Sequence, residues 1–275
     1  LRSRTPQVPV FHDLAFEHFP EDVKKLEAWH YRRYFPRYAQ KARQIITVSE
    51  ATAADVRAHY DTPADKLTVV HNACAEHFQP IPCELHAGVR TQFSAGKPYF
   101  MCVGAIQPRK NLSRVIAAFD AFKQDDTTDH QLLLVGRKAW NFDEVIHAYR
   151  DSPNKDAIHF TGFVSDADLN RIYNAATALV YAPYFEGFGL PVLEAMACDT
   201  PVITSNLSSM PEVAGDAALL VNPHHTENIA AALHRISTEL GLAESMVAKG
   251  QVRRKAFSWD RSADRVWNVL TNALH

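Results

Sequence analysis

Apolar residues along this chain occur in two alternating patterns. Short continuous apolar runs, such as residues 132–135, predict strands of a parallel sheet that is covered on both faces. Between these runs, apolar residues recur every three or four positions, which predicts amphipathic helices. The alternation of the two patterns predicts an α/β protein.

The alternation is regular from residue 99 onward. It predicts strands near 99–104, 131–136, 157–161, 178–182, 201–204 and 218–221. It predicts helices near 111–123, 141–150, 166–175, 190–197 and 209–214. Six strands at this spacing indicate a complete Rossmann-like domain over residues 99–257, followed by an amphipathic helix over residues 258–275.

The first 80 residues follow the same rhythm with fewer strands. Apolar runs predict strands at 8–11, 45–48 and 67–70, and Ser49 is the expected N-cap of the helix that follows the second run. Three strands are fewer than an independent doubly wound domain needs. We therefore expect residues 1–80 to form an incomplete Rossmann-like domain, in a chain that begins at Leu1 and has been trimmed. Residues 81–98 contain several Pro and Gly with little periodicity, which predicts a linker.

The helical pattern of residues 21–43 has two further features. Pro36 lies inside it and is expected to kink or split the helix. Apolar side chains at steps of three to five form a stripe among seven basic residues: Leu26, Trp29, Tyr34, Tyr38 and Ala42. Such a surface could rest on an anionic membrane, although a solvated basic face with an aromatic packing stripe is the favoured interpretation. The basic residues are Lys24, Lys25, Arg32, Arg33, Arg37, Lys41 and Arg43.

Composition limits the class of protein further. A chain of 275 residues with 47% hydrophobic residues can bury a large core, and a formal net charge of −2 gives no general attraction to nucleic acid. The four cysteines form no CxxC pair, so free thiols in a reducing compartment are favoured over disulfides. There is no run of eighteen apolar residues and no signal-peptide pattern, so we expect a soluble, cytoplasmic protein.

The candidate chemistry centres on residues 181–221. Glu186 and Glu194 lie eight residues apart across a Gly-Phe-Gly-Leu-Pro turn, and Pro191 suits the first position of a helix. The N-terminus of a helix attracts anions such as phosphate, and Gly187 and Gly189 leave the backbone open to close approach. The turn could therefore hold a sugar phosphate between two carboxylates. An ordinary strand-to-helix corner is the alternative for this spacing alone.

Two other segments carry polar residues directly after a predicted strand, where α/β proteins bind ligands. Gly104 would let a ligand approach the end of its strand, and Arg109 and Lys110 place two cations just beyond it. His12, in the pair His12-Asp13, follows the first apolar run. No G-x-G-x-x-G fingerprint, no H-E-x-x-H and no G-x-S-x-G occurs, so dinucleotide, zinc-peptidase and serine-hydrolase chemistry are not supported.

From residue 103 to the C-terminus, and more loosely before it, the chain resembles the retaining GT-B glycosyltransferases of family 4. The resemblance rests on the E-x7-E segment, on the tail PVITSNLSSMPEVAGDAALLV and on the G-x3-P-x-K-N pattern at residues 104–111. It implies two Rossmann-like domains that face a cleft, the N-terminal one lacking its first third with its Gly-rich loop. It also implies that the C-terminal helix crosses back to the N-terminal domain. Where the family usually has Gly, this chain has Asp199, a residue that tolerates left-handed backbone.

The resemblance also implies residue roles. Arg109 and Lys110 would hold the diphosphate of a nucleotide-sugar donor, with no metal ion. Glu186 would bind hydroxyls of the donor sugar, Glu194 those of the ribose, and His12 would face the sugar from the other domain. The base would lie near the loop that contains Phe163, and backbone amides would contact the sugar and phosphate. Those amides belong to Phe188, Gly189 and Leu190.

The sequence thus predicts transfer of a hexose, with retention, from GDP-mannose or a UDP-hexose to a saccharide or lipid-linked saccharide acceptor. No cofactor other than this donor is expected, and the donor sugar is expected to be mannose. The expected location is cytoplasmic, with a peripheral contact at the inner face of the membrane as one alternative. Because the acceptor half is incomplete, a non-catalytic or partner-dependent nucleotide-sugar-binding chain is the alternative function.

Overall fold

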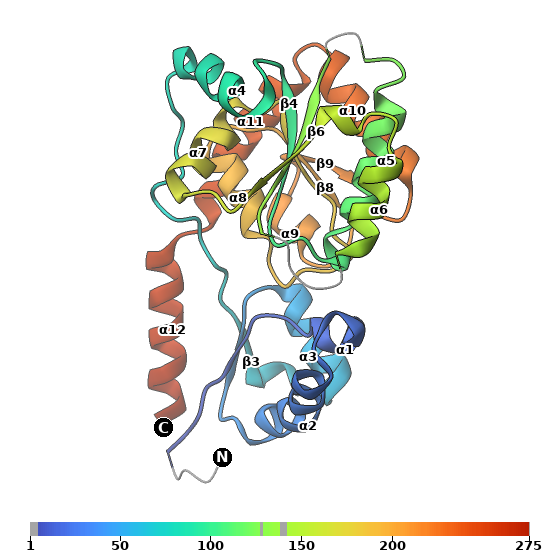
Figure 1. Ribbon diagram of the computed structural model, residues 1–275. Coiled ribbons are helices and arrows are strands. Elements are labelled where there is room, and N and C mark those ends of the chain that lie inside the picture. The colour runs from blue at the N-terminus through green and yellow to red at the C-terminus, as the bar shows by residue number, and fades with distance from the viewer. Residues whose placement is uncertain (1–4, 127–128, 138–141, 275) are drawn as a thin grey trace.

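The computed structural model describes residues 5–126, 129–137 and 142–274 of the 275-residue chain. In the described residues the chain forms two parallel sheets, one of three strands and one of six (Figure 1). The three-stranded sheet comes first in the sequence and has the order β1-β2-β3. The six-stranded sheet has the order β6-β5-β4-β7-β8-β9. The predicted α/β class is confirmed.

The strands and helices of the larger sheet follow the sequence-based prediction to within about two residues at each end. Its strands are β4 (Tyr99–Val103), β5 (Gln131–Val135), β6 (Ile158–Gly162), β7 (Ala178–Tyr181), β8 (Val202–Ser205) and β9 (Ala218–Val221). Its predicted helices are α5 (Leu112–Phe122), α6 (Asp143–Asp151), α7 (Asp166–Ala175), α8 (Leu190–Ala197) and α9 (Met210–Ala214). Residue 141, where the second of these helices was expected to begin, lies outside the described residues.

The order of the strands fixes where a ligand can bind. After β4 the chain adds β5 and β6 on one side of it, and then β7, β8 and β9 on the other. The loops that follow β4 and β7 therefore diverge at the carboxyl ends of two neighbouring strands. In open α/β sheets this switch point is where ligands bind.

Alternate side chains of each strand pack into one of two hydrophobic clusters. Along β4, Phe100 and Cys102 pack with α5 on one face, and Tyr99 and Met101 pack with α7 and α8 on the other. All four side chains are buried, as the two-residue period of a strand covered on both faces requires. The four cysteines are free, and Cys102 and Cys198 are buried.

The expected linker at residues 81–98 is wrong in part, because most of it is helical. It contains the 3-10 helix η3 (Cys83–Leu85) and α4 (His86–Ser94). Val89 of α4 is fully buried in the core cluster that also contains α7. The Pro and Gly residues lie mainly at the borders: Pro82 is the N-cap, and Ala95, with φ of 52°, ends the helix before Gly96. Tertiary packing therefore stabilises a helix in a segment whose local hydrophobic pattern is weak.

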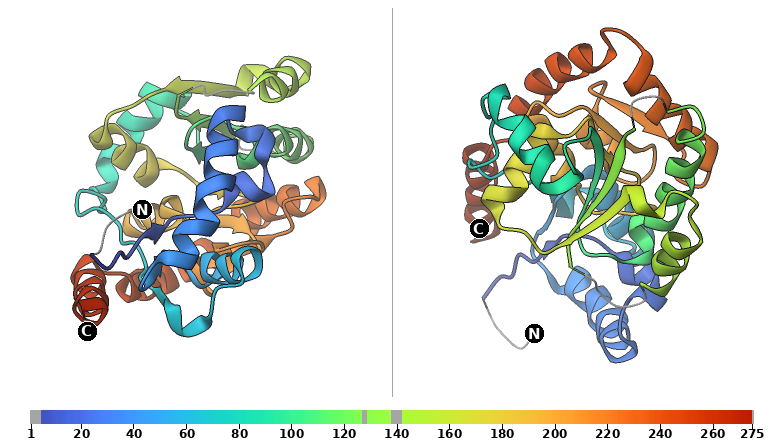
Figure 2. Two further views of the ribbon diagram at one scale, coloured as in Figure 1. Left: turned by 90° about the horizontal axis from the view of Figure 1, so that it is seen from below. Right: turned by 45° about the horizontal axis from the view of Figure 1, so that its top comes forward.

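Helices α10 (Thr226–Thr238) and α11 (Leu242–Arg253) were not predicted. The signal for α10 was present, since Ile229, Leu233 and Ile236 recur at helical spacing and are buried. Both helices follow β9 and complete the cover of the larger sheet (Figure 2).

The N-terminal part consists of short strands and the helices that cover them. The strands are β1 (Val10–Phe11), β2 (Ile45–Thr47) and β3 (Leu67–Val69). The helical elements are α1 (Ala15–His18), η1 (Pro20–Asp22), α2 (Lys25–Lys41), α3 (Glu50–Tyr60) and η2 (Ala64–Lys66). Ser49 caps α3 as predicted, because its hydroxyl oxygen accepts a hydrogen bond from the N–H of Thr52 at 3.0 Å.

Two expectations for α2 are corrected. Pro36 does not split the helix, which is continuous from Lys25 to Lys41. The residue whose carbonyl loses its partner, Arg32, is exposed, which limits the cost of the missing N–H. The apolar stripe is also shifted, since Leu26 and Trp29 are 77% and 59% exposed. The residues that pack inward are Ala28, Tyr31, Phe35, Tyr38 and Ala39.

The last helix, α12 (Trp259–Leu274), lies beside the N-terminal sheet (Figure 1). The Ser262 hydroxyl donates to the carbonyl of His71 at 2.6 Å, and Arg265 donates to the carbonyl of Val69 at 3.1 Å. Val269 packs against Ile46 and Val70. Trp267 and Leu270 of the same helix are exposed. Among the helices that the structure describes, none combines the length and the apolar character needed to cross a bilayer.

Candidate active site

A cavity of about 230 Å³ lies between the two sheets at the switch point. The loop after β7 and the start of α8 form one wall of the cavity, together with Lys110 and Tyr181. His12, Asp13, Val48 and Asn72 line it from the N-terminal part. Two predicted catalytic residues, His12 and Glu186, therefore face the same cavity from opposite sides, although they are 174 positions apart in the sequence.

The two walls of the cavity are in direct contact at Gly187. Its backbone lies so close to His12 that a Cβ atom at this position would overlap the carbonyl oxygen of His12. The carbonyl oxygen of Gly187 accepts hydrogen bonds from the hydroxyls of Ser49 at 2.6 Å and Thr52 at 3.2 Å. The sequence predicted openness to a ligand at Gly187, but the structure uses the missing side chain for contact with the N-terminal part.

Glu186 is the centre of the charge distribution in the cavity. It is 9% exposed, and its Oε1 lies 2.5 Å from both Arg109 Nη1 and Lys110 Nζ. Burial alone would raise the pKa of Glu186, but the positive charges of Lys110 and Arg109 outweigh this effect and hold the pKa below its usual value. Burial lowers the pKa of the Lys110 ammonium despite the attraction of Glu186. One carboxylate is thus in contact with two cations, of which Lys110 lines the cavity and Arg109 lies behind Glu186, outside the lining.

The backbone around Glu186 is fixed by two serines of the loop between β8 and α9. The Ser208 and Ser209 hydroxyls donate to the Glu186 carbonyl oxygen at 2.5 Å and 2.8 Å. Ser209 also donates to the carbonyl of Phe188 at 2.9 Å. Ser208 has a φ of 54°, an unusual conformation for a residue with a side chain. The loop between β8 and α9 therefore holds the Glu186 loop in place.

The cations are held by their own loop, η4 (Pro108–Lys110), which follows β4. Arg109 Nη1 also donates to the carbonyl of Phe185 at 3.2 Å, and Lys110 Nζ donates to the Tyr181 hydroxyl at 2.6 Å. Gly104 ends the strand with a φ of 125°, and the space on its side-chain face is occupied by the stem of Lys110. Gly104 therefore helps to place Lys110, whereas it does not line the cavity, and its contact with a ligand remains a prediction.

Glu194 lies one turn inside α8. Its Oε2 accepts a hydrogen bond from the Tyr173 hydroxyl at 2.8 Å, which orients the carboxylate. Burial raises the pKa of Glu194, and the hydrogen bond from Tyr173 offsets only part of that effect. Gly189, with φ of 103°, precedes the helix, and Asp199 beyond its end has a φ of 54°. The prediction of a left-handed Asp199 is confirmed.

The remaining predicted donor residues occupy different surroundings. Phe188, Gly189 and Leu190 line the cavity, and the side chain of Phe188 is buried against Phe257. Phe163 follows β6, is 83% exposed and is not part of the cavity wall. A stacking role for Phe163 remains a prediction.

Glu212 connects the two sheets and was not identified from the sequence. Its carboxylate accepts hydrogen bonds from the N–H groups of Glu50 at 2.9 Å and Ala51 at 3.2 Å, at the N-terminus of α3. Its Oε1 also lies 2.7 Å from Nε2 of His71. Burial would raise the pKa of Glu212, but the hydrogen bonds from His71 and from the two N–H groups leave the pKa lowered. A carboxylate at a helix N-terminus is stabilising. The contacts of Glu212 therefore stabilise the packing of the C-terminal part against the N-terminal part.

Comparison with known proteins identifies the family of a chain with this fold and cavity. The profile of "Glycosyl transferases group 1" matches residues 89–253, more than half of the chain. The profile of "Glycosyltransferase Family 4" matches residues 1–75. The chain therefore belongs to the group 1 glycosyltransferases, as the resemblance of its motifs predicted.

The curated relatives include several enzymes that transfer mannose. O-antigen chain mannosyltransferase B of Escherichia coli is 30% identical over 263 residues, which are 95% of this chain and 69% of the relative. The chain spans only 28–29% of the length of the next three relatives, which are about 27% identical.

Solved structures share the fold. Sucrose-phosphate synthase from Thermosynechococcus elongatus superposes with a TM-score of 0.81 at 24% identity, covering 97% of this chain and 67% of that one. Anabaena HepE in complex with UDP-glucose gives a TM-score of 0.83 at 18% identity, covering 98% and 73%. The predicted GT-B class is confirmed by these likenesses.

Proposed function

We propose that this chain transfers mannose from GDP-mannose to a hydroxyl of a saccharide or lipid-linked saccharide, with retention at the anomeric carbon. The observation that carries the proposal is the contact of Glu186 with both Arg109 and Lys110, in a cavity that His12 lines from the other side. Mannose is favoured over other hexoses because a curated relative that is 30% identical over 95% of this chain is a mannosyltransferase.

The cations supply the charge that departure of the diphosphate requires. Arg109 can hold phosphate oxygens with its planar fork, and Lys110 adds a point charge. Both are already positioned by hydrogen bonds, so little reorganisation is needed when negative charge develops. Together with the N-terminus of α8, they would bind the diphosphate without a metal ion. The Glu186 carboxylate compensates one of these two positive charges.

When the donor binds, its diphosphate would compete with Glu186 for the cations. The Glu186 carboxylate would then turn to the hydroxyls of the sugar and position it, while Glu194 binds the ribose. His12 would contact the sugar from the N-terminal part. The departing phosphate would take the proton of the acceptor hydroxyl on the same face of the sugar, which accounts for retention without a nucleophilic side chain.

The test is a transfer assay with labelled GDP-mannose and a panel of mannosides and lipid-linked saccharides. We expect labelled product with the wild-type chain and at least a 100-fold lower rate with Glu186→Gln, because misplacement of a reacting group costs about that much. Proton NMR of the product should show an α-mannoside from the α-linked donor. A β-mannoside would contradict retention.

One observation favours a second candidate function. The described N-terminal sheet has three strands, while the larger sheet has six. A chain with an incomplete acceptor side could bind the donor and transfer nothing without a partner. The same assay separates the two functions, provided that donor binding is measured alongside: binding without transfer on any acceptor favours the second.

A further inference from the structure

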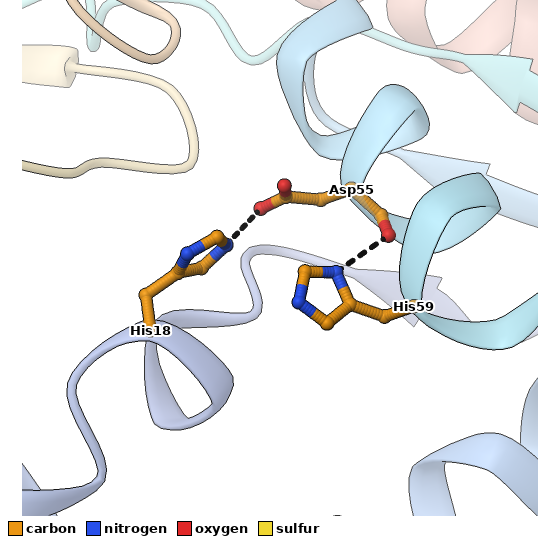
Figure 3. A group of neighbouring side chains, drawn as sticks. All are labelled: His18, Asp55 and His59. Atoms are coloured by element: carbon orange, nitrogen blue, oxygen red, sulfur yellow. Dashed lines mark hydrogen bonds and ion pairs between the residues drawn. The ribbon is translucent and has the colours of Figure 1, made fainter.

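Three metal-ligating side chains meet outside the donor cavity. His18 lies at the end of α1, and Asp55 and His59 lie on α3 (Figure 3). One ligand atom from each of the three lies within 4.8 Å of the others, and no other such group of three occurs among the residues that the structure describes. None of these three residues lines the cavity that contains Glu186.

The spacing on α3 explains two of the three positions. Residues four apart on a helix lie on the same face, so Asp55 and His59 point to the same side. His18 reaches them from α1, with Nε2 2.9 Å from Oδ2 of Asp55. The ring centroids of His18 and His59 are 5.1 Å apart, with the planes at 74°.

The hydrogen bond of His59 determines which of its nitrogens can bind a metal. Nδ1 lies 3.0 Å from the backbone carbonyl oxygen of Asp55. A carbonyl oxygen only accepts hydrogen bonds, so Nδ1 carries the proton and Nε2 keeps its lone pair. Histidines that bind metals are commonly oriented by this kind of second hydrogen bond to a carbonyl or carboxylate.

The surroundings of His18 restrict its ring in a similar way. Its ring packs against Phe185 at 4.5 Å between centroids and an angle of 32°. Phe185 precedes Glu186 and is held by Arg109, which donates to its carbonyl. The two imidazole rings are therefore fixed by separate contacts, which reduces the entropy lost when they bind one ion.

An ion pair between His18 and Asp55 is the simpler interpretation of these contacts. It would contribute at most about 1 kcal/mol at such an exposed position. It involves only His18 and Asp55, and the imidazole of His59, whose Nδ1 is bonded to the Asp55 carbonyl, lies beside this pair without taking part in it. Two imidazoles and one carboxylate form a donor set that zinc commonly uses with a fourth position left for water.

We propose that His18, Asp55 and His59 form a site for a divalent transition metal ion of the zinc type. The ion would join α1 to α3. Because His18 packs on Phe185, the ion would also restrain the loop that carries Glu186. The site is separate from the proposed donor site, and its test does not depend on transferase activity.

The experiment measures zinc binding to tag-free, chelator-treated protein by competition with a chromophoric chelator. We expect one zinc ion per chain. Removing a group that merely orients a metal ligand costs about 10–100-fold in affinity, so His18→Ala, Asp55→Asn and His59→Ala should each weaken binding at least tenfold. The matched control is His77→Ala, which removes a histidine that is 3.8 Å from Asp166 without belonging to any such group of three.

Two further measurements make the result decisive. Circular dichroism and urea midpoints establish that each variant is folded. Cobalt bound to the unaltered protein should give the visible absorption of a four-coordinate nitrogen and oxygen site, a readout that needs no variant. Absence of zinc binding by the wild type would overturn the proposal. So would zinc affinity that is unchanged in the His18→Ala/His59→Ala double variant.

Discussion

The Ser49 hydroxyl donates a hydrogen bond of 2.6 Å to the carbonyl oxygen of Gly187, although 138 positions separate the two residues in the sequence. Ser49 is the N-cap of α3 in the N-terminal part, and Gly187 lies beside Glu186 in the loop after β7. The same hydroxyl oxygen caps α3, so helix formation and docking of the loop depend on one side chain. The two parts of the chain therefore meet directly at the proposed reaction centre.

Replacing Gly187 with Ala should separate the two walls of the cavity. The added Cβ would overlap the backbone of His12, and overpacking of this kind costs about 1–3 kcal/mol. Urea denaturation should show the loss as a lower midpoint. Gly88→Ala is the control, because a Cβ there meets nothing within 4 Å and a helical Gly→Ala change should stabilise the chain by about 0.5–1 kcal/mol. Equal stability of the two variants would rule out the close contact.

Glu186→Gln should separate binding from transfer. The variant keeps the shape of the side chain but removes the negative charge that competes with a diphosphate for Arg109 and Lys110. We expect nucleoside diphosphate binding to be retained or tightened, with transfer reduced at least about 100-fold. Isothermal titration and the transfer assay measure the two effects separately. A variant that still transfers mannose at the wild-type rate would remove Glu186 from the mechanism.

Lys110→Met should weaken the diphosphate contact specifically. A hydrogen bond to a charged group contributes about 1.5–3 kcal/mol, which corresponds to about 10- to 100-fold in affinity. The loss should appear with GDP and should be absent with guanosine, which has no phosphate. Lys249→Met is the matched control, since that lysine pairs with Asp216 outside the cavity wall. The same loss of affinity with guanosine as with GDP would mean that Lys110 does not contact the phosphates.

The contact of Glu212 should make stability depend on pH in a defined window. Its pKa is lowered in the folded chain from a usual value of 4.5. The stabilisation is therefore complete above pH 4.5 and is lost as the pH falls through the lower folded-state pKa. Glu212→Gln should be less stable than the wild type at neutral pH, and the difference should shrink on acidification below 4.5. Urea midpoints between pH 3 and 7 test this, and a constant difference would contradict it.

The exposed apolar residues of α2 allow a test of membrane contact. If Leu26 and Trp29 insert into the membrane beside the basic residues, changing both to Glu should abolish co-sedimentation of the protein with anionic vesicles. Its co-sedimentation with neutral vesicles should not change. Trp267→Glu is the control, as Trp267 is an exposed tryptophan on α12. If the wild-type protein does not sediment with anionic vesicles, the basic face of α2 is exposed to solvent and does not bind membrane.

The sequence was sufficient for features that depend on local pattern. The six strands of the larger sheet, the cap at Ser49 and the left-handed Asp199 each follow from a few neighbouring residues. The contact of Glu186 with Arg109 and Lys110 could be predicted in part from the sequence, because all three residues were expected near the carboxyl ends of β4 and β7. That one oxygen of Glu186 would contact both cations could not be predicted without their distances.

Features that depend on distant contacts were missed. Glu212 reads as an ordinary first-turn helix charge, and its partners Glu50 and Ala51 are more than 160 positions away. Residues 81–98 and α2 were misjudged for a related reason: burial of Val89, and the side on which α2 packs, are set by neighbours from other parts of the chain. Tertiary contacts of this kind override weak local preference.

The most direct test of the account is thermal stabilisation of this chain by GDP-mannose, with GDP, UDP-glucose and ADP in parallel. A ligand at 100 times its dissociation constant adds about 2.7 kcal/mol to the stability of the folded chain. The account predicts a clear rise in melting temperature with GDP-mannose and GDP, reduced in Lys110→Met. A rise with UDP-glucose alone would correct the donor. No rise with any of the four would contradict a nucleotide-sugar site in this cavity.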